Sequence, residues 1–69
     1  MIIKRGGDKW ELENFGNDVN EVQITKNSNL MVETASGKIY FKSNQMLISD
    51  LDVIVYMLGE YRDKINKRI

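Results

Sequence analysis

The side chains that most often carry out acid–base, nucleophilic or metal chemistry are missing from this sequence. Its 69 residues contain no histidine and no cysteine. Without histidine, catalysis near neutral pH lacks its usual general acid or base, and a zinc or copper site lacks its commonest ligand. Without cysteine there is no thiol nucleophile, no disulfide and no thiolate metal site. We therefore expect a protein that is not an enzyme and that uses no metal or cofactor.

Two pairs of carboxylates have a spacing that could hold a divalent cation or act together on a substrate. Glu11 and Glu13 lie two residues apart, as do Asp50 and Asp52. The first pair falls on the solvent-facing side of a predicted strand. The second falls at the start of a predicted helix, where the helix macrodipole favours negative charge. Both pairs have a structural explanation, which we favour over a catalytic one.

The charge balance disfavours a nucleic-acid partner and favours self-association. Ten basic and ten acidic residues give a net charge of zero, whereas domains that hold a nucleic-acid backbone are usually basic. Neutrality also weakens the repulsion between copies. The longest apolar run, Val53 to Leu58, is too short to cross a bilayer, and the first residues lack the features of a signal peptide. We expect a cytoplasmic protein without membrane contact.

Turn-forming residues divide the first part of the chain into five predicted strands. The turns are Gly6-Gly7, residues 14–18, residues 27–29 and Ser36-Gly37, each rich in residues that tolerate tight turns. The strands between them are predicted at residues 1–5, 8–13, 19–26, 30–34 and 38–42.

The turn types also predict which side chains face each other. A two-residue turn at Gly6-Gly7 pairs Ile3 with Trp10, and a three-residue loop with a left-handed Asn29 pairs Ile24 with Val32. These registers agree on one apolar and one polar face, as in an antiparallel sheet with one wet side. The apolar face is predicted to hold Val22, Ile24, Leu30, Val32, Ile39 and Phe41, and the polar face Gln23, Thr25, Met31, Glu33, Tyr40 and Lys42.

After residue 45 the spacing of apolar residues changes from two to about 3.6, which predicts a helix over residues 49–67. Ser49 is the expected N-cap, with Asp52 three residues later as a variant of the capping box. The predicted fold is one α+β domain spanning residues 1–69. It consists of an antiparallel β-meander of about five strands with one C-terminal amphipathic helix packed on one face.

The predicted helix has more apolar surface than one sheet needs. One stripe is expected to cover the sheet, namely Leu51, Ile54, Leu58, Tyr61 and Ile65, with Val55 beside it. Val53, Tyr56 and Met57 then project elsewhere and, together with Glu60, form the expected partner or dimer interface. A helix that is apolar nearly all round is normally buried on more than one side.

We favour a symmetric second copy as the cover for this flank. Gly59 is compatible with that arrangement, because a glycine lets two backbones approach closely. Two alternatives remain: the loops at 14–18 or 43–48 fold over the flank, or the helix breaks at Gly59.

These features favour a small non-enzymatic protein-binding or regulatory module that forms a homodimer. Its size and composition also fit an origin in a phage or mobile element. The alternative is a single-stranded nucleic-acid-binding domain that uses the open sheet face, with Lys4, Lys9, Tyr40 and Lys42 as contacts. Glu11 and Glu33 are predicted on the same face and would repel phosphates, so the alternative is disfavoured.

Overall fold

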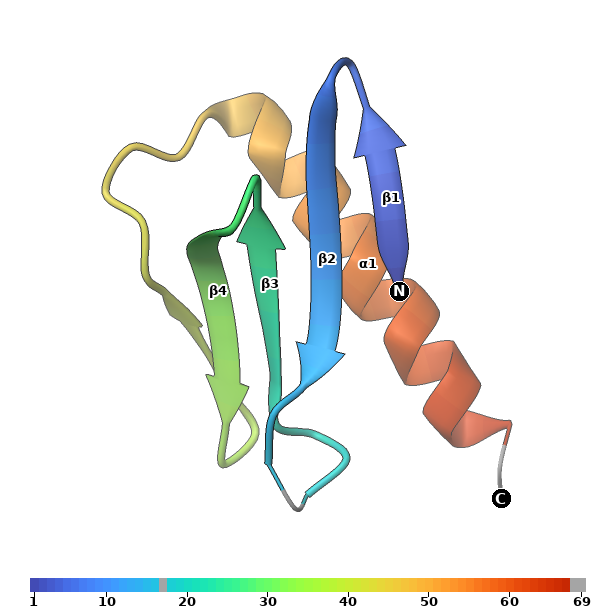
Figure 1. Cartoon of the computed structure of the whole chain (residues 1–69). Coiled ribbons are helices and arrows are strands. Elements are labelled where there is room, and N and C mark those ends of the chain that lie inside the picture. The colour runs from blue at the N-terminus through green and yellow to red at the C-terminus, as the bar shows by residue number, and fades with distance from the viewer. Residues whose placement is uncertain (17, 68–69) are drawn as a thin grey trace.

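Five antiparallel strands followed by one helix make up the fold, which confirms the predicted α+β meander (Figure 1). The structure is a computed structural model and describes residues 1–16 and 18–67. The elements are β1 Ile2–Arg5, β2 Asp8–Asn14, β3 Val22–Lys26, β4 Asn29–Ala35, β5 Lys38–Phe41 and α1 Ile48–Asn66. Each strand pairs with its neighbour in sequence, so the sheet order is β1-β2-β3-β4-β5.

The first and last hairpins have the registers that their turns predict. Gly6 and Gly7 both have positive φ angles, 57° and 87°, and Ile3 lies opposite Trp10. In the turn between β4 and β5, Ser36 and Gly37 have φ angles of 55° and 76°. Positive φ at both central residues matches the right-handed twist of the flanking strands, which is why these short turns fix the pairing.

The hairpin between β3 and β4 reaches its predicted register by a different route. Its turn has two residues, Asn27 and Ser28, with φ angles of 51° and 70°, and Lys26 pairs with Asn29. The predicted three-residue loop with a left-handed Asn29 is therefore wrong. Ile24 still pairs with Val32, as predicted, because a β-bulge shifts the register between Ile24 and Thr25.

The bulge also changes which side chains of β4 are buried. It inserts one extra residue, so Met31 and Val32 together oppose one position on β3. Both are buried, whereas Leu30 is half-buried. The prediction that Met31 belongs to the polar face is therefore wrong.

The turn between β2 and β3 extends further than predicted, so β3 begins at Val22 and not at residue 19. The Asn20 amide donates to the Asp18 side chain at 2.9 Å, and the Glu21 amide donates to the Asp18 carbonyl at 3.0 Å. Such bonds from an aspartate to nearby amides compete with strand pairing. Asn17, within the turn predicted at 14–18, lies outside the described residues.

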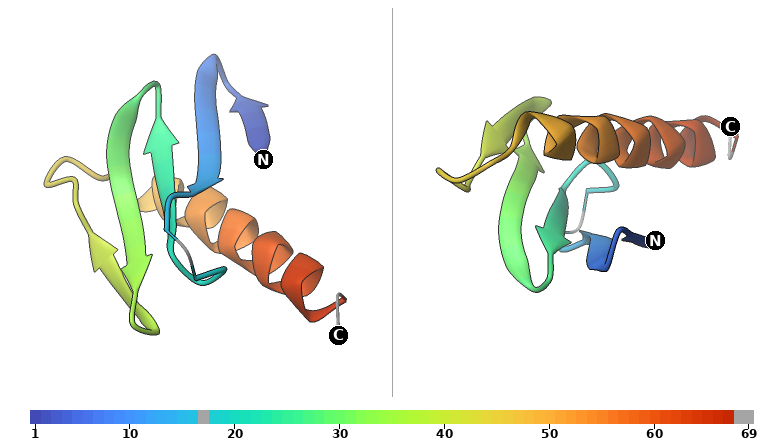
Figure 2. Two further views of the ribbon diagram at one scale, coloured as in Figure 1. Left: turned by 60° about the horizontal axis from the view of Figure 1, so that its bottom comes forward. Right: turned by 90° about the horizontal axis from the view of Figure 1, so that it is seen from above.

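The helix lies across the side of the sheet that carries the core (Figure 2). It begins at Ile48, one residue earlier than predicted, and its N-cap is Leu47 and not Ser49. The Leu47 amide donates to Asp50 Oδ2 at 3.0 Å. The buried core consists of Trp10, Leu12, Val22, Ile24, Met31, Val32, Val53, Ile54 and Met57.

The helix is rotated about its axis relative to the prediction. Val53 and Met57 were expected to project away from the sheet, but they are 5% and 0% exposed and belong to the core. The physical reason is Asp50, which is also buried and pairs with Lys26 of β3. Residues three, four and seven positions after Asp50 share its side of the helix, so Val53, Ile54 and Met57 turn inward with it.

The molecule is elongated along the helix, with extents of 35 × 20 × 18 Å. The C-terminal half of α1 extends past the sheet (Figure 2). The accessible surface is 5035 Å², compared with about 4,450 Å² for a compact folded protein of this mass. The protomer therefore leaves more surface uncovered than its size requires.

Candidate functional site

An apolar groove lies between α1 and the edge of the sheet at β5. Figure 2 shows β5 (yellow-green) at the sheet edge far from β1, apart from the C-terminal half of the helix. The groove has a volume of about 550 Å³. We call it the β5 groove, and it is lined by Asn20, Val22, Thr34, Gly37, Lys38, Ile39, Val55, Leu58, Gly59, Tyr61, Arg62, Ile65 and Asn66.

A second, shallower depression of about 260 Å³ continues the apolar surface toward the N-terminus of α1, between Phe41 and Leu51. Phe41 lies two residues from Ile39 on the same face of β5, and Leu51 lies one helical turn from Val55. Large apolar side chains exposed along both depressions form one strip. This apolar strip consists of Ile39, Phe41, Leu47, Ile48, Leu51 and Val55, whose exposure ranges from 39% for Leu51 to 87% for Ile48.

The helical part of the strip follows one row of the helix surface. Ile48, Leu51 and Val55 are spaced by three and four residues, and Gly59 comes four residues later. A Cβ atom built on Gly59 would meet nothing within 4 Å. Packing inside the protomer therefore does not require a glycine at this position.

Charged side chains flank the same row at its two ends. Asp52 is exposed near the start of α1, and Arg62 lines the β5 groove near its end. Arg62 Nε lies 3.8 Å from Asp63 Oδ1, and both side chains are more than half exposed. An exposed pair at that distance contributes little, so the Arg62 guanidinium can change partner at small cost.

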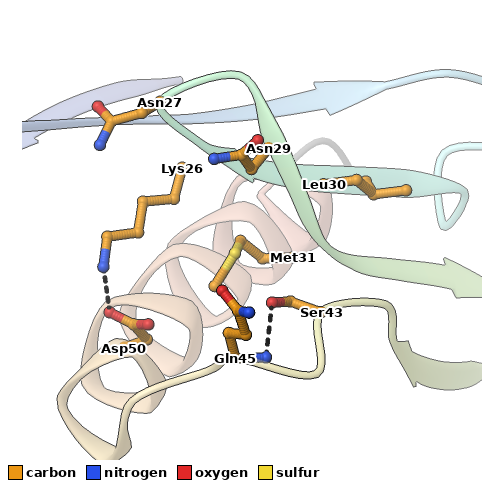
Figure 3. Close-up of a pocket in the computed structure, with 8 residues that line it drawn as sticks. All are labelled: Lys26, Asn27, Asn29, Leu30, Met31, Ser43, Gln45 and Asp50. Carbon is orange, nitrogen blue, oxygen red and sulfur yellow. Dashed lines mark hydrogen bonds and ion pairs between the residues drawn. The ribbon is translucent and has the colours of Figure 1, made fainter.

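A polar cluster fixes the start of α1 on the sheet (Figure 3). Lys26 Nζ donates to Asp50 Oδ1 at 2.9 Å, lies 3.9 Å from Asp8 Oδ2, and sits 5.6 Å from the centroid of the Trp10 ring. Asp50 also accepts the amide of Leu47. The cluster borders a polar cleft of about 440 Å³ between the β3–β4 turn and the segment before α1.

The ionic state of this cluster follows from its contacts. The hydrogen bond from Lys26 lowers the pKa of the Asp50 carboxyl below its ordinary value, and the Leu47 amide acts in the same direction against the effect of burial. The same bond raises the pKa of the Lys26 ammonium. Both groups are therefore charged and satisfied near neutral pH, and the cluster acts as a structural anchor.

The carboxylates of the two pairs differ in their surroundings. Asp50 is buried against Lys26, whereas Asp52 is exposed. Glu11 forms an ion pair with Lys9 at 3.1 Å, and the hydrogen bond from Lys9 lowers the pKa of Glu11. Within the part of the chain that the structure describes, no three metal-ligating side chains come together.

The four predicted nucleic-acid contacts lie on the sheet face opposite the helix, in two separate places. Lys4 pairs with Lys9 across β1 and β2, whereas Tyr40 lies on β5 with Lys42 just after it. Lys9 and Tyr40 are three strand spacings apart, roughly 14 Å across the sheet, and Tyr40 is level with Glu13, four residues along β2 from Lys9. Three glutamates, Glu11, Glu13 and Glu33, share this face. Lys42 Nζ lies 3.9 Å from Glu33 Oε2. This face is therefore of mixed charge, and nucleic-acid binding stays a prediction.

Of the four predicted interface residues, two lie in the core and two on the surface. Val53 and Met57 are buried within the protomer, so they cannot form the proposed contact in this fold. Tyr56 and Glu60 are exposed one turn apart, but neither lines the β5 groove or the second depression.

Comparison of the chain with protein-family models, curated proteins and solved structures finds no match. Within residues 1–16 and 18–67, no helix combines the length and the apolar character that crossing a bilayer requires.

The sequence did not predict that Leu47 and Ile48 belong to the exposed apolar surface, or that Leu51 and Val55 are left uncovered by the sheet. Periodicity gave the width of the apolar surface of the helix but assigned Leu51 and Val55 to the core. Asp50 carried no distinct signal in the sequence, because a carboxylate in the first turn of a helix already has an explanation in the helix dipole. Lys26, the last residue of β3 directly before the Asn27-Ser28 turn, is the cation that Asp50 pairs with in the folded chain.

Proposed function

We propose that this domain is a small non-enzymatic interaction module that works as a homodimer, with the apolar strip covered by a second copy of the chain. The observation that carries the proposal is the strip itself, six large apolar side chains that stay exposed along α1 and β5. Isolated apolar residues on a surface are common, but a contiguous set beside a groove is typical of an interaction site. A cytoplasmic location, a regulatory role and a phage or mobile-element origin complete the proposal on the sequence arguments.

The size of the strip suits an association of moderate strength. Covering it on two copies contributes roughly 10–20 kcal/mol, at about 1.5–3 kcal/mol for each side chain that passes from fully exposed to buried. Association costs about 4–15 kcal/mol in lost freedom of motion. The difference between the middles of these two ranges is about 5–6 kcal/mol, which corresponds to a dissociation constant of roughly 0.1 mM.

Charge supports a second copy over an unrelated partner. The chain has no net charge, so two copies do not repel each other overall. The surface beside the strip carries an acidic side chain, Asp52, at one end and a basic one, Arg62, at the other. A surface with opposite charges at its two ends is complementary to itself when one copy is inverted.

The test is the mass of the protein in solution, measured by sedimentation equilibrium from about 1 μM to about 1 mM, a range that brackets a dissociation constant of roughly 0.1 mM. We expect the wild type to dimerise within this range and Val55→Asp to remain a monomer. Tyr56→Asp is the matched control, since Tyr56 is also exposed on α1 but lies outside the groove. A monomeric wild type, or dissociation by Tyr56→Asp alone, contradicts the proposal.

A further inference from the structure

Building on the proposed dimer, we infer that the two α1 helices pack antiparallel, with Val55 of each copy seated over Gly59 of the other. The two-fold axis then crosses the helix pair at the level of residue 57. Val55 and Gly59 are each two residues from that level, so the pairing satisfies both copies at once.

The first argument comes from the shape of the exposed row on α1. Val55 is 68% exposed and branched at Cβ, whereas Gly59 has open space where a side chain would stand. Glycine lowers helix propensity relative to alanine, and no neighbouring atom among the described residues requires a glycine here. A side chain of the partner subunit seated over Gly59 would explain why a glycine occupies this position, because a glycine lets the two backbones come close.

The second argument comes from charge. Asp52 and Arg62 are each five residues from the level of the proposed axis, on opposite sides of it. An antiparallel pair therefore places Asp52 beside Arg62 of the partner subunit, and symmetry makes this contact twice. A parallel pair would set Asp52 beside Asp52 of the partner subunit and would align the two helix dipoles unfavourably.

The free edge of β5 offers another way to dimerise, and its side chains oppose it. β5 is the last strand of the sheet, so one of its edges is unpaired within the described residues. An antiparallel β5 pair centred on Tyr40 would place Lys38 opposite Lys42 of the partner subunit. Like charges directly opposite each other destabilise a strand pair, and lysines on edge strands commonly prevent such pairing.

Charge reversal tests the orientation. Asp52→Arg creates two arginine pairs in the proposed dimer, and Arg62→Asp creates two aspartate pairs. We expect each variant alone to weaken dimerisation about tenfold or more at low salt, and the difference to shrink as salt rises. The double variant D52R/R62D, and an equimolar mixture of the two single variants, should both recover wild-type affinity, the mixture as a heterodimer.

Glu60→Arg is the matched control, because it makes the same change of charge as Asp52→Arg on an exposed residue outside the groove. We expect it to leave dimerisation unchanged. A second variant, Gly59→Leu, fills the space over which Val55 is seated and should prevent dimerisation while circular dichroism shows an intact helix.

The outcomes separate this inference from the proposed function. If Val55→Asp dissociates the dimer but neither charge reversal has an effect, the antiparallel orientation is wrong and the dimer surface stands. If the single variants weaken the dimer and their mixture does not restore it, Asp52 and Arg62 are not partners. If the wild type is a monomer throughout, the proposed function fails first.

Discussion

The two long sides of α1 are almost equally apolar, yet one forms the core and the other faces solvent. The buried side carries Val53, Ile54 and Met57, and the exposed side carries Ile48, Leu51 and Val55. Hydrophobicity alone does not distinguish them. The deciding residue is Asp50, whose contact with Lys26 of β3 places one side of the helix against the sheet.

The comparison shows that one polar contact can select among packing arrangements of similar apolar burial. Most of the apolar surface of α1 would gain from contact with the sheet in any rotation, because the hydrophobic effect is non-directional. The ion pair is directional, and a buried carboxylate without its partner is strongly unfavourable. Ile48, Leu51 and Val55 are left outside by this choice and form the helical part of the apolar strip.

The largest expected effect is a difference in unfolding free energy between substitutions on the two sides of α1. Met57→Ala removes a fully buried side chain and should cost about 2–5 kcal/mol of unfolding free energy. Val55→Ala on the exposed side should stay within about 0.5 kcal/mol in the monomer. Urea denaturation at concentrations too low for dimerisation measures both. Equal losses would mean that the exposed side also contributes to the core.

A smaller effect should come from the anchor itself. Asp50→Asn leaves the Lys26 ammonium without its carboxylate and should destabilise the fold, by less than Met57→Ala because the Lys26 side chain keeps 20% exposure. Adding Lys26→Met to Asp50→Asn should recover part of the loss, since the uncompensated charge is gone. Urea denaturation of the wild type, both single variants and the double variant gives the coupling between the two residues. Additive losses would show that the pair does not anchor α1.

The same anchor should make stability depend on pH on the acid side. The pKa of Asp50 is lowered from an ordinary value of 3.8 in the folded state. A lowered carboxyl pKa contributes stability that is present above the unfolded value and is lost as pH falls through the folded value. We therefore expect stability to decline from about pH 4 downward, and the decline to be shallower in Asp50→Asn.

Glu11→Gln is the control for this pH dependence. Glu11 also has a lowered pKa through Lys9, so it titrates in the same direction. Its ion pair lies on the solvent-facing side of the sheet, where such pairs contribute little. If Glu11→Gln flattens the acid decline as much as Asp50→Asn does, the anchor is not the source of the pH dependence.

The strand order and most of the pairing could be predicted from the sequence because the turns carry local signals. Gly6-Gly7 and Ser36-Gly37 each fix a register by backbone geometry, and Ile3 opposite Trp10 follows from the first of them. The bulge at Met31 has no such signal. An extra residue in β4 with the turn shortened by one gives the same pairing of Ile24 with Val32.

The sequence predicted that α1 has more apolar surface than the sheet covers, but it assigned this surface to the wrong residues. An apolar excess on α1 follows from composition and spacing, and Tyr56 of the predicted flank does remain exposed. The assignment to Val53 and Met57 failed because spacing fixes which residues share a side, and not which side meets the sheet. That choice depends on Asp50 and Lys26, which are 24 residues apart in sequence and close only after folding.

The smallest expected effect concerns Gly59, which lies on the exposed row of α1, four residues after Val55. Gly59→Ala adds a methyl group into open space and improves helix propensity, so it should stabilise the monomer by about 0.5–1 kcal/mol. Urea denaturation at protein concentrations at which the chain is monomeric measures this gain, with Val55→Ala as the neutral control. Destabilisation of the monomer would show that the glycine serves the protomer's own packing. A stabilised monomer leaves contact with a second copy as the reason for a glycine on this row of the helix.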